Sequence, residues 1–126
     1  MTNPFALIIE DDWKLAIICA QALRLAQFET EIVQDGNAAL DRLAATTPAV
    51  VVLDLHLPHV SGREILRQIR ADRRLDQTRV ILATADALMA ETLRAESDLV
   101  LLKPISVRQL RDLATRLRPH DTIWVS

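Results

Sequence analysis

The sequence predicts an α/β fold in which five parallel strands form one doubly wound sheet, in the order 2-1-3-4-5, with helices on both faces. Two observations lead to this fold class. Five short aliphatic runs alternate with longer segments of helical periodicity, and four of the five runs are continuously apolar. Continuous apolar runs are typical of parallel strands, because both sides of such a strand are covered. Right-handed crossovers then place helices on the two faces.

The predicted strands follow from the positions of these runs. They cover residues 5–10, 30–34, 50–54, 79–84 and 99–102. The second run, TEIVQ, mixes polar and apolar residues, which favours a position at an edge of the sheet. Each run is short enough for a strand and too short for a typical helix.

The predicted helices lie between and after the strands, over residues 12–26, 37–45, 62–74, 87–95 and 107–118. Ser61 and Ser106 are suitable N-cap residues for the third and fifth. Five arginines make the third helix basic, and we expect a solvated face there: Arg63, Arg67, Arg70, Arg73 and Arg74. Cys19 falls on the inward stripe of the first helix and is expected in the core.

Length and composition fit one domain with one core, because the chain has 126 residues of which half are hydrophobic. We expect one domain over residues 1–118 and a C-terminal tail or linker stump over 119–126, where TIWV is apolar. The net charge of −2 gives no reason to expect direct nucleic-acid binding. The single cysteine fits the cytoplasm, and no apolar run reaches membrane-spanning length.

Chemically active residues stand at the carboxyl ends of four predicted strands. The first strand ends in Glu10 and Asp11, followed by Asp12, and the third ends in Asp54. Thr84 closes the fourth, and Lys103 follows the fifth. In the order 2-1-3-4-5 the first and third strands are neighbours, so these side chains are expected to meet at one edge of the sheet.

Several carboxylates at one site repel each other, by roughly 4 kcal/mol for a pair 4 Å apart at an effective dielectric constant of 20. Such a cluster requires a compensating cation, and oxygen ligands with room for water suit Mg²⁺. A carboxylate beside a divalent ion can attack a phosphoryl group. A hydroxyl such as that of Thr84 and an ammonium such as that of Lys103 suit the oxygens of that group.

Four motifs at these strand ends resemble those of the receiver domain of two-component response regulators. They are IIEDD at 8–12, VVLDLHLPHVSG at 51–62, LATAD at 82–86 and LLKPI at 101–105. The resemblance covers residues 5 to about 118. It implies a flavodoxin-like (βα)5 fold, as in chemotaxis receivers, and a phosphoryl-accepting signalling switch that takes its phosphoryl group from a histidine kinase or a phosphotransfer protein. It also implies no enzyme activity beyond the domain's own phosphorylation and dephosphorylation.

The resemblance assigns a role to each residue. Asp54 is the expected phosphoacceptor, with Thr84 and Lys103 on the phosphoryl oxygens. The expected Mg²⁺ ligands are Asp11 directly, Glu10 through water, Asp54, and the backbone carbonyl of His56. The side chains of His56 and Asp86, each two places after a site residue, are expected to modulate the lifetime of the phosphorylated state. Lys103-Pro104 is expected to be cis.

Three features depart from the family pattern. Val100 stands where receivers usually carry an aromatic residue, so the usual readout of phosphorylation is in doubt. Only 19 positions separate Thr84 from Lys103, about one helical turn fewer than expected, which reshapes a surface where receivers form homodimers or meet an output domain. Trp13, Ile17 and Ala20 add a second apolar face to the first helix, and we expect Trp13 and Ile17 to dock a kinase or phosphotransfer partner.

Two other functions stay open at this stage. A receiver-like interaction module that works without phosphorylation is favoured by Val100 and the short fourth helix, and opposed by the intact site residues. A hydrolase with an aspartyl-phosphate intermediate would normally have a second acid two residues after Asp54, where this chain has His56.

Overall fold

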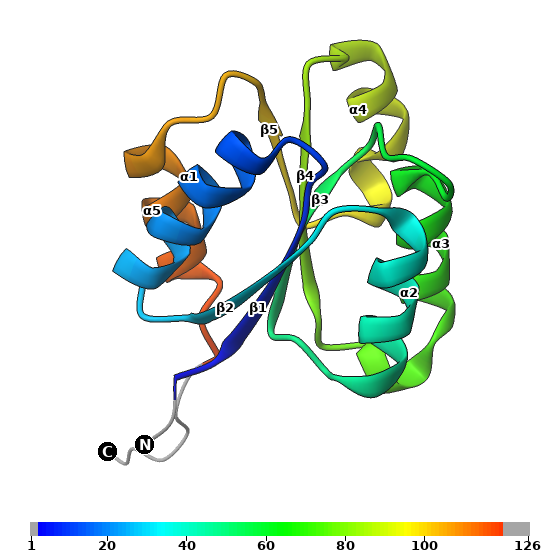
Figure 1. The fold of residues 1–126 in the computed structure, drawn as a ribbon, viewed down its shortest axis with the longest axis horizontal. Helices are drawn as coiled ribbons and strands as arrows, with labels where there is room; N and C mark the ends of the chain where they lie inside the picture. Colours follow the sequence, from blue (N-terminus) through cyan, green and yellow to red (C-terminus); the bar gives the residue numbers. More distant parts are fainter. Residues whose placement is uncertain (1–2, 120–126) are drawn as a thin grey trace.

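One five-stranded parallel sheet forms the centre of the molecule in the computed structural model, which describes residues 3–119 (Figure 1). The strand order is β2-β1-β3-β4-β5, as predicted. The strands are β1 (Phe5–Ile9), β2 (Glu29–Val33), β3 (Val50–Asp54), β4 (Arg79–Thr84) and β5 (Leu99–Leu102). All four neighbouring pairs are parallel. The predicted fold class is therefore confirmed.

Helices cover both faces of the sheet. They are α1 (Trp13–Leu25), α2 (Gly36–Ala45), α3 (Gly62–Ala71), α4 (Ala87–Leu93) and α5 (Val107–Arg116), with two short 3-10 helices, η1 (Arg73–Leu75) and η2 (Arg94–Glu96). Helices α1 and α5 lie together on one face, and α2, α3 and α4 cover the other (Figure 1). Within residues 3–119, no helix has the length and apolar character needed to cross a bilayer.

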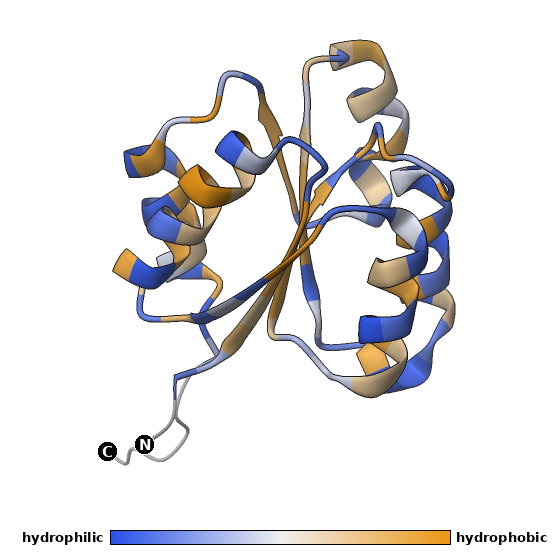
Figure 2. Ribbon diagram, viewed as in Figure 1, coloured by the Kyte–Doolittle hydropathy of each residue, from blue (hydrophilic) through white to orange (hydrophobic). Residues whose placement is uncertain are grey.

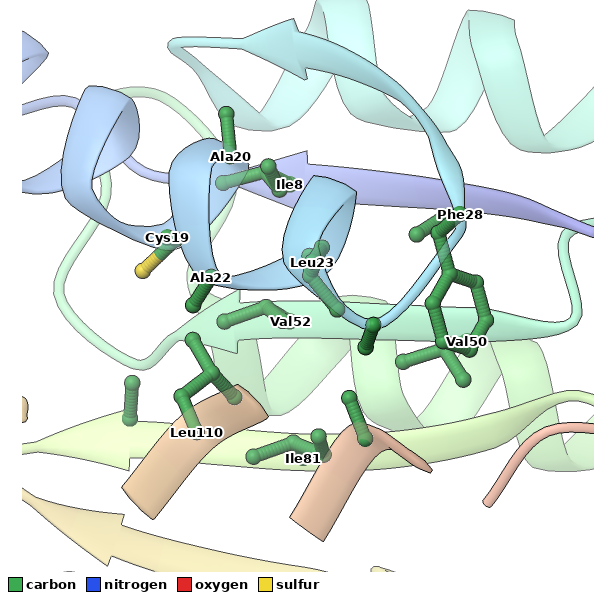
Figure 3. Packing of buried hydrophobic residues seen from close by; sticks show 14 of the residues in the cluster. Ile8, Cys19, Ala20, Ala22, Leu23, Phe28, Val50, Val52, Ile81 and Leu110 are labelled. Atoms are coloured by element: carbon green, nitrogen blue, oxygen red, sulfur yellow. The ribbon is translucent and has the colours of Figure 1, made fainter. Parts of the chain in front are cut away.

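Alternation along the strands divides the buried side chains between two apolar layers. On the α1/α5 side, Ile8, Val52 and Ile81 of the sheet pack with Leu23 of α1 and Leu110 of α5 (Figure 3). On the other side, a second layer joins β1, β3 and β4 to α2, α3 and α4. The central strands are accordingly the most continuously hydrophobic part of the ribbon (Figure 2). Cys19 is buried in the α1/α5 layer, as predicted.

The N-caps of α3 and α5 are those that the sequence predicts. The Ser61 hydroxyl accepts a hydrogen bond from the Glu64 N–H at 3.2 Å, and the Ser106 hydroxyl accepts one from the Gln109 N–H at 3.2 Å. Each cap satisfies one of the N–H groups that a helix start leaves without a partner.

The predicted solvated arginine face of the third helix is wrong in part. Helix α3 ends at Ala71, so Arg73 and Arg74 belong to η1. The Arg74 guanidinium donates to the carbonyl oxygens of Leu43 and Thr46 and so ties η1 to the end of α2. Arginine binds buried carbonyls of neighbouring segments in this way because its planar fork offers several donors.

Arg70 likewise binds other segments rather than solvent. Its guanidinium donates to Asp98 Oδ2 at 2.9 Å, to the Thr78 carbonyl at 3.1 Å and to the Glu96 carbonyl at 2.8 Å. Asp98 Oδ2 also accepts from the Val80 N–H at 2.7 Å. This network holds the start of β5 against β4 and α3, where α4 is short and η2 leads into the strand.

Helix α1 carries a shorter exposed apolar patch than predicted. Trp13 is 53% exposed and Ile17 is 41% exposed, but Ala20 is fully buried. The expectation that Ala20 shares the exposed face is therefore wrong. Ala20 lies farther along α1, and its small side chain belongs to the same buried core layer as Ile8 and Leu23 (Figure 3).

Candidate functional site

Parallel pairing brings the ends of β1, β3, β4 and β5 to one edge of the sheet. Ile9 pairs with Leu53, so Glu10 and Asp54 follow from neighbouring positions. Asp54 pairs with Ala83, and Thr84 pairs with Leu102. The acids, the threonine and Lys103 therefore meet beyond the carboxyl ends of the strands, as the strand order predicts.

Three carboxylates form the centre of the site. One oxygen of each of Glu10, Asp11 and Asp54 lies within 4.8 Å of the others. Glu10 and Asp54 are each 2% exposed, whereas Asp11 is open to solvent. The donor set consists only of oxygen, and one side of it is open to water. Such a set can hold a hard divalent cation.

Lys103 bridges the two buried acids. Its Nζ lies 3.1 Å from Glu10 Oε1 and 3.4 Å from Asp54 Oδ1. Burial opposes the charge on the ammonium, but the two carboxylates outweigh it and raise the pKa of Lys103. The Lys103 N–H donates to the Thr84 carbonyl at 2.9 Å, and the Lys103-Pro104 bond is cis, as predicted. The side chain is thereby fixed as a cation at the strand ends.

Burial makes the ionised form of Glu10 unfavourable. Burial raises its pKa to about 7, and the nearby Asp54 charge adds to the rise. The Asp12 N–H, which donates to Glu10 Oε2 at 3.1 Å, and Lys103 both lower it without cancelling the effect of burial. One lysine is thus insufficient compensation for the buried acids, and a further positive charge would stabilise the ionised cluster.

Asp12 and Gln34 position the acidic loop. The Asp12 side chain is the N-cap of α1 and accepts from the N–H groups of Lys14 and Leu15 at 3.0 and 3.3 Å. The Gln34 side-chain amide donates to the Asp11 carbonyl at 3.2 Å. Asp12 therefore caps the helix, while the contact from Gln34 could not be read from the sequence.

Asp54 is oriented by the loop that follows it. The His56 N–H donates to Asp54 Oδ1 at 3.1 Å, the same oxygen that Lys103 contacts. Asp54 Oδ2 has no hydrogen bond to residues 3–119, and no buried side-chain oxygen or nitrogen of this range lacks a partner. Oδ2 is therefore the oxygen of this carboxylate without a hydrogen bond to the described residues. The His56 side chain is exposed beside it in sequence.

Two glycines hold this loop in place, a role that the sequence analysis missed. A Cβ on Gly62 would lie 2.3 Å from the Asp54 carbonyl oxygen and 2.6 Å from the Leu55 Cα. A Cβ on Gly36 would lie 2.3 Å from the Val60 carbonyl oxygen. The loop from Asp54 to Val60 is thus clamped by the first turns of α2 and α3. These are the only glycines of the chain, which was the available signal.

Thr84 and Asp86 link the site to α4. Thr84 is fully buried, and its hydroxyl accepts a hydrogen bond from the Asp86 N–H at 3.0 Å. The Asp86 carboxylate is the N-cap of α4 and accepts from the Met89 N–H at 2.9 Å. Val100 packs against the α2/α3/α4 core layer. The side chain of Asp86 is thus engaged in a helix cap.

Comparison with known proteins gives one consistent result. The profile of the response regulator receiver domain matches residues 6–115. The chain is 32% identical over 122 residues to the response regulator MprA of Mycolicibacterium vanbaalenii, covering 91% of this chain and 52% of that protein. It thus spans about half the length of that relative.

Solved structures agree with this result. The receiver domain of the Francisella response regulator 1452 is 27% identical, with a TM-score of 0.80, and the match covers 91% of this chain and 96% of that one. The chemotaxis response regulator CheY4 of Vibrio cholerae has the same fold, with a TM-score of 0.83 at 21% identity over 92% of this chain and 99% of that one.

Proposed function

Because the chain belongs to the family of response regulator receiver domains of two-component systems, we propose that Asp54 is the residue that accepts the phosphoryl group. The observation that carries this proposal is the environment of Asp54. Its carboxylate is held at Oδ1 by Lys103 and by the His56 N–H, stands in a cluster with two further acids, and leaves Oδ2 without a hydrogen bond to the described residues. A carboxylate that is held in place and desolvated is prepared for nucleophilic attack.

The proposed reaction moves one phosphoryl group from a phosphohistidine of a histidine kinase or phosphotransfer protein. An Asp54 carboxylate oxygen attacks phosphorus and forms the acyl phosphate bond. The phosphorus–nitrogen bond breaks, and its electron pair returns to the imidazole. Lys103 stays protonated, because its pKa is raised, and its ammonium offsets charge on the phosphoryl oxygens. After transfer, the Thr84 hydroxyl bonds a phosphoryl oxygen.

The oxygen donors of Glu10, Asp11 and Asp54 fit Mg²⁺. We assign the His56 backbone carbonyl to the same ion as a further protein ligand. When bound, the ion would supply positive charge to the phosphoryl oxygens and to the acids. The raised pKa of Glu10 supports this assignment, because Lys103 alone does not offset the burial of this acid. Glu10 already contacts Lys103 directly, so its part in ion binding is through water.

We assign two side chains at the edge of the site to control of the phosphorylated state. The exposed His56 imidazole lies two residues after Asp54 and limits access of water to the phosphoryl group. Asp86 acts through α4, because its N–H releases the Thr84 hydroxyl when that hydroxyl turns to the phosphoryl group. In this account the domain is no enzyme beyond its own phosphorylation and dephosphorylation, and its location in the cytoplasm stays a prediction.

The partner surface is proposed at the start of α1. Trp13 and Ile17 expose apolar area one to two turns from Asp11, which suits a helix that carries a phosphohistidine. Leu88 of α4 and Leu102 of β5, 82% and 51% exposed, offer a second surface for a homodimer or an output domain. Ile17→Glu should slow transfer from a phosphorylated partner and leave labelling by a small phosphodonor unchanged, while Gln21→Glu, exposed on the same helix, should change neither.

Incubation with Mg²⁺ and a small phosphodonor tests the function. The intact mass should rise by one phosphoryl group, and chelation of Mg²⁺ should abolish the rise. Asp54→Asn should stay unlabelled, while Asp41→Asn, an exposed acid of α2, should be labelled like the parent. If the Asp54→Asn chain is labelled to the same extent, the proposal is wrong, and a phosphorylation-independent interaction module becomes the better account.

A further inference from the structure

Asp11 is the acid of the cluster whose side chain is least constrained. Glu10 and Asp54 are buried, and both contact Lys103. Asp11 is exposed, and its carboxylate makes no hydrogen bond or ion pair with any residue in the range 3–119; the expected C-terminal tail beyond Pro119 lies outside this range. One oxygen of Asp11 nevertheless lies within 4.8 Å of the other two acids. The placement of this oxygen therefore depends on the backbone of residue 11.

Two contacts from the end of β2 hold that backbone. The Glu10 N–H donates to the Val33 carbonyl at 3.1 Å, directly after the pairing of Ile9 with Val33. The Gln34 side-chain amide then donates to the Asp11 carbonyl at 3.2 Å. This is the only hydrogen bond of Asp11 to the described residues, and it joins positions 23 residues apart. Gln34 is therefore the side chain that fixes the Asp11 peptide.

The segment that follows β2 is itself fixed. The Asp35 carboxylate caps α2 and accepts a hydrogen bond from the Ala38 N–H at 2.8 Å. The Gly36 N–H donates to the Pro58 carbonyl at 3.2 Å, in the loop that follows β3. Residues 34–36 thus contact the loops after both acid-bearing strands, and the amide of residue 34 acts from a defined position.

The chemistry of the contact requires an amide at position 34. A carbonyl oxygen only accepts hydrogen bonds, so its partner must be a donor, and the Gln34 amide carries two N–H groups. A glutamate carboxylate or a methionine of similar length has no donor to offer. Lysine or arginine could donate, but each would bring a positive charge to a site proposed for a cation. Glutamine supplies the hydrogen bond without adding charge.

We propose that Gln34 is a positioning residue for the divalent ion, a role that rests on the proposed function of the acidic cluster. Its amide holds the Asp11 peptide so that the exposed carboxylate stays beside the two buried acids. Without this bond the carboxylate samples more positions, and ion binding must restrict them, which weakens the affinity for the ion. Once the ion is bound, the reactivity of Asp54 toward a phosphodonor stays that of the parent.

Titration with Mn²⁺ tests the proposal without any phosphorylation. Mn²⁺ takes oxygen ligands as Mg²⁺ does, and the electron paramagnetic resonance signal of the free ion gives the bound fraction. Gln34→Met keeps the length of the side chain and removes the donor, so its dissociation constant for Mn²⁺ should rise about tenfold. Gln77→Met, exposed before β4 at the opposite end of the sheet, should bind Mn²⁺ like the parent. Equal dissociation constants for Gln34→Met and the parent would overturn the proposal.

Labelling of Asp54 at increasing Mg²⁺ separates ion affinity from other effects of the substitution. Gln34→Met should need about tenfold more Mg²⁺ than the parent for half-maximal labelling by a small phosphodonor, and should reach the parental rate at saturation. A lower rate at saturation with an unchanged half-maximal concentration would overturn the proposal, because Gln34 would then not act through the ion. If the parent binds Mn²⁺ but is not labelled, the proposed function fails, while tenfold weaker Mn²⁺ binding by Gln34→Met would still establish the role of Gln34.

Discussion

Replacing Glu10 with Gln should stabilise the free domain above pH 7 while impairing its phosphorylation. The pKa of Glu10 rises from 4.5 to about 7 in the folded chain, mainly because the carboxyl group is buried. The folded state therefore binds more protons than the unfolded state between these two values, and stability falls as pH rises through this window. One pKa unit corresponds to about 1.4 kcal/mol, so ionised Glu10 costs roughly 3 kcal/mol above pH 7.

Glutamine approximates the protonated carboxyl group and cannot ionise. Glu10→Gln should thus match the parent near pH 4.5 and exceed its free energy of unfolding by roughly 2–3 kcal/mol at pH 8. Added Mg²⁺ should reduce this difference in the free energy of unfolding between the variant and the parent. The ion stabilises the folded parent by binding to it, and it binds the variant less well. The same substitution should slow phosphorylation by a small donor.

Urea unfolding, followed by circular dichroism at pH 5, 6, 7 and 8 with a chelator and then with Mg²⁺, measures both effects. Glu29→Gln, an exposed acid at the start of β2, serves as the control and should follow the parent at every pH. The free energy of unfolding of Glu10→Gln minus that of the parent should increase from pH 5 to pH 8. If it does not change, the buried charge of Glu10 does not destabilise the folded domain.

Three further outcomes are expected. Gly62→Ala should lower the free energy of unfolding by roughly 1–3 kcal/mol and slow labelling of Asp54, because the added Cβ would lie 2.3 Å from the Asp54 carbonyl oxygen. A free energy of unfolding in urea equal to that of the parent would show that Gly62 does not hold this loop in place. Arg70→Ala should lower the midpoint of thermal unfolding several degrees more than Arg67→Ala, because Arg70 binds distant segments whereas Arg67 forms only an exposed ion pair within α3. Equal midpoints for the two variants would show that the contacts of Arg70 do not stabilise the fold. Cys19 should react with a thiol reagent only on unfolding, since burial raises its pKa to about 12, and rapid reaction of the native chain would contradict its packing.

The sequence could predict the sheet and the site residues that lie at the ends of its strands. Five apolar runs define the sheet, and parallel pairing then brings the final residue of each run to one edge. The sequence alone therefore places four residues together, because each directly ends or follows a strand: Glu10, Asp54, Thr84 and Lys103. The N-caps Ser61 and Ser106 were also predictable, because each serine directly precedes its helix in the sequence.

Contacts between distant segments could not be predicted in this way. Arg70 looks like one of several surface arginines, and only the folded chain brings Asp98 to it from 28 residues away. Ala20 follows the spacing of Trp13 and Ile17, but it is fully buried in the core layer, whereas Trp13 and Ile17 stay exposed. The raised pKa of Glu10 depends on burial by other segments, which helical or strand periodicity does not specify.

The most direct test of the account is to locate the phosphoryl group. After treatment with Mg²⁺ and a small phosphodonor, borohydride reduces an acyl phosphate to an alcohol, which marks the modified residue for peptide mass spectrometry. The account predicts a single reduced side chain, at residue 54, and none when Mg²⁺ is withheld. Reduction at Asp11 or at another acid, with residue 54 unchanged, would contradict it.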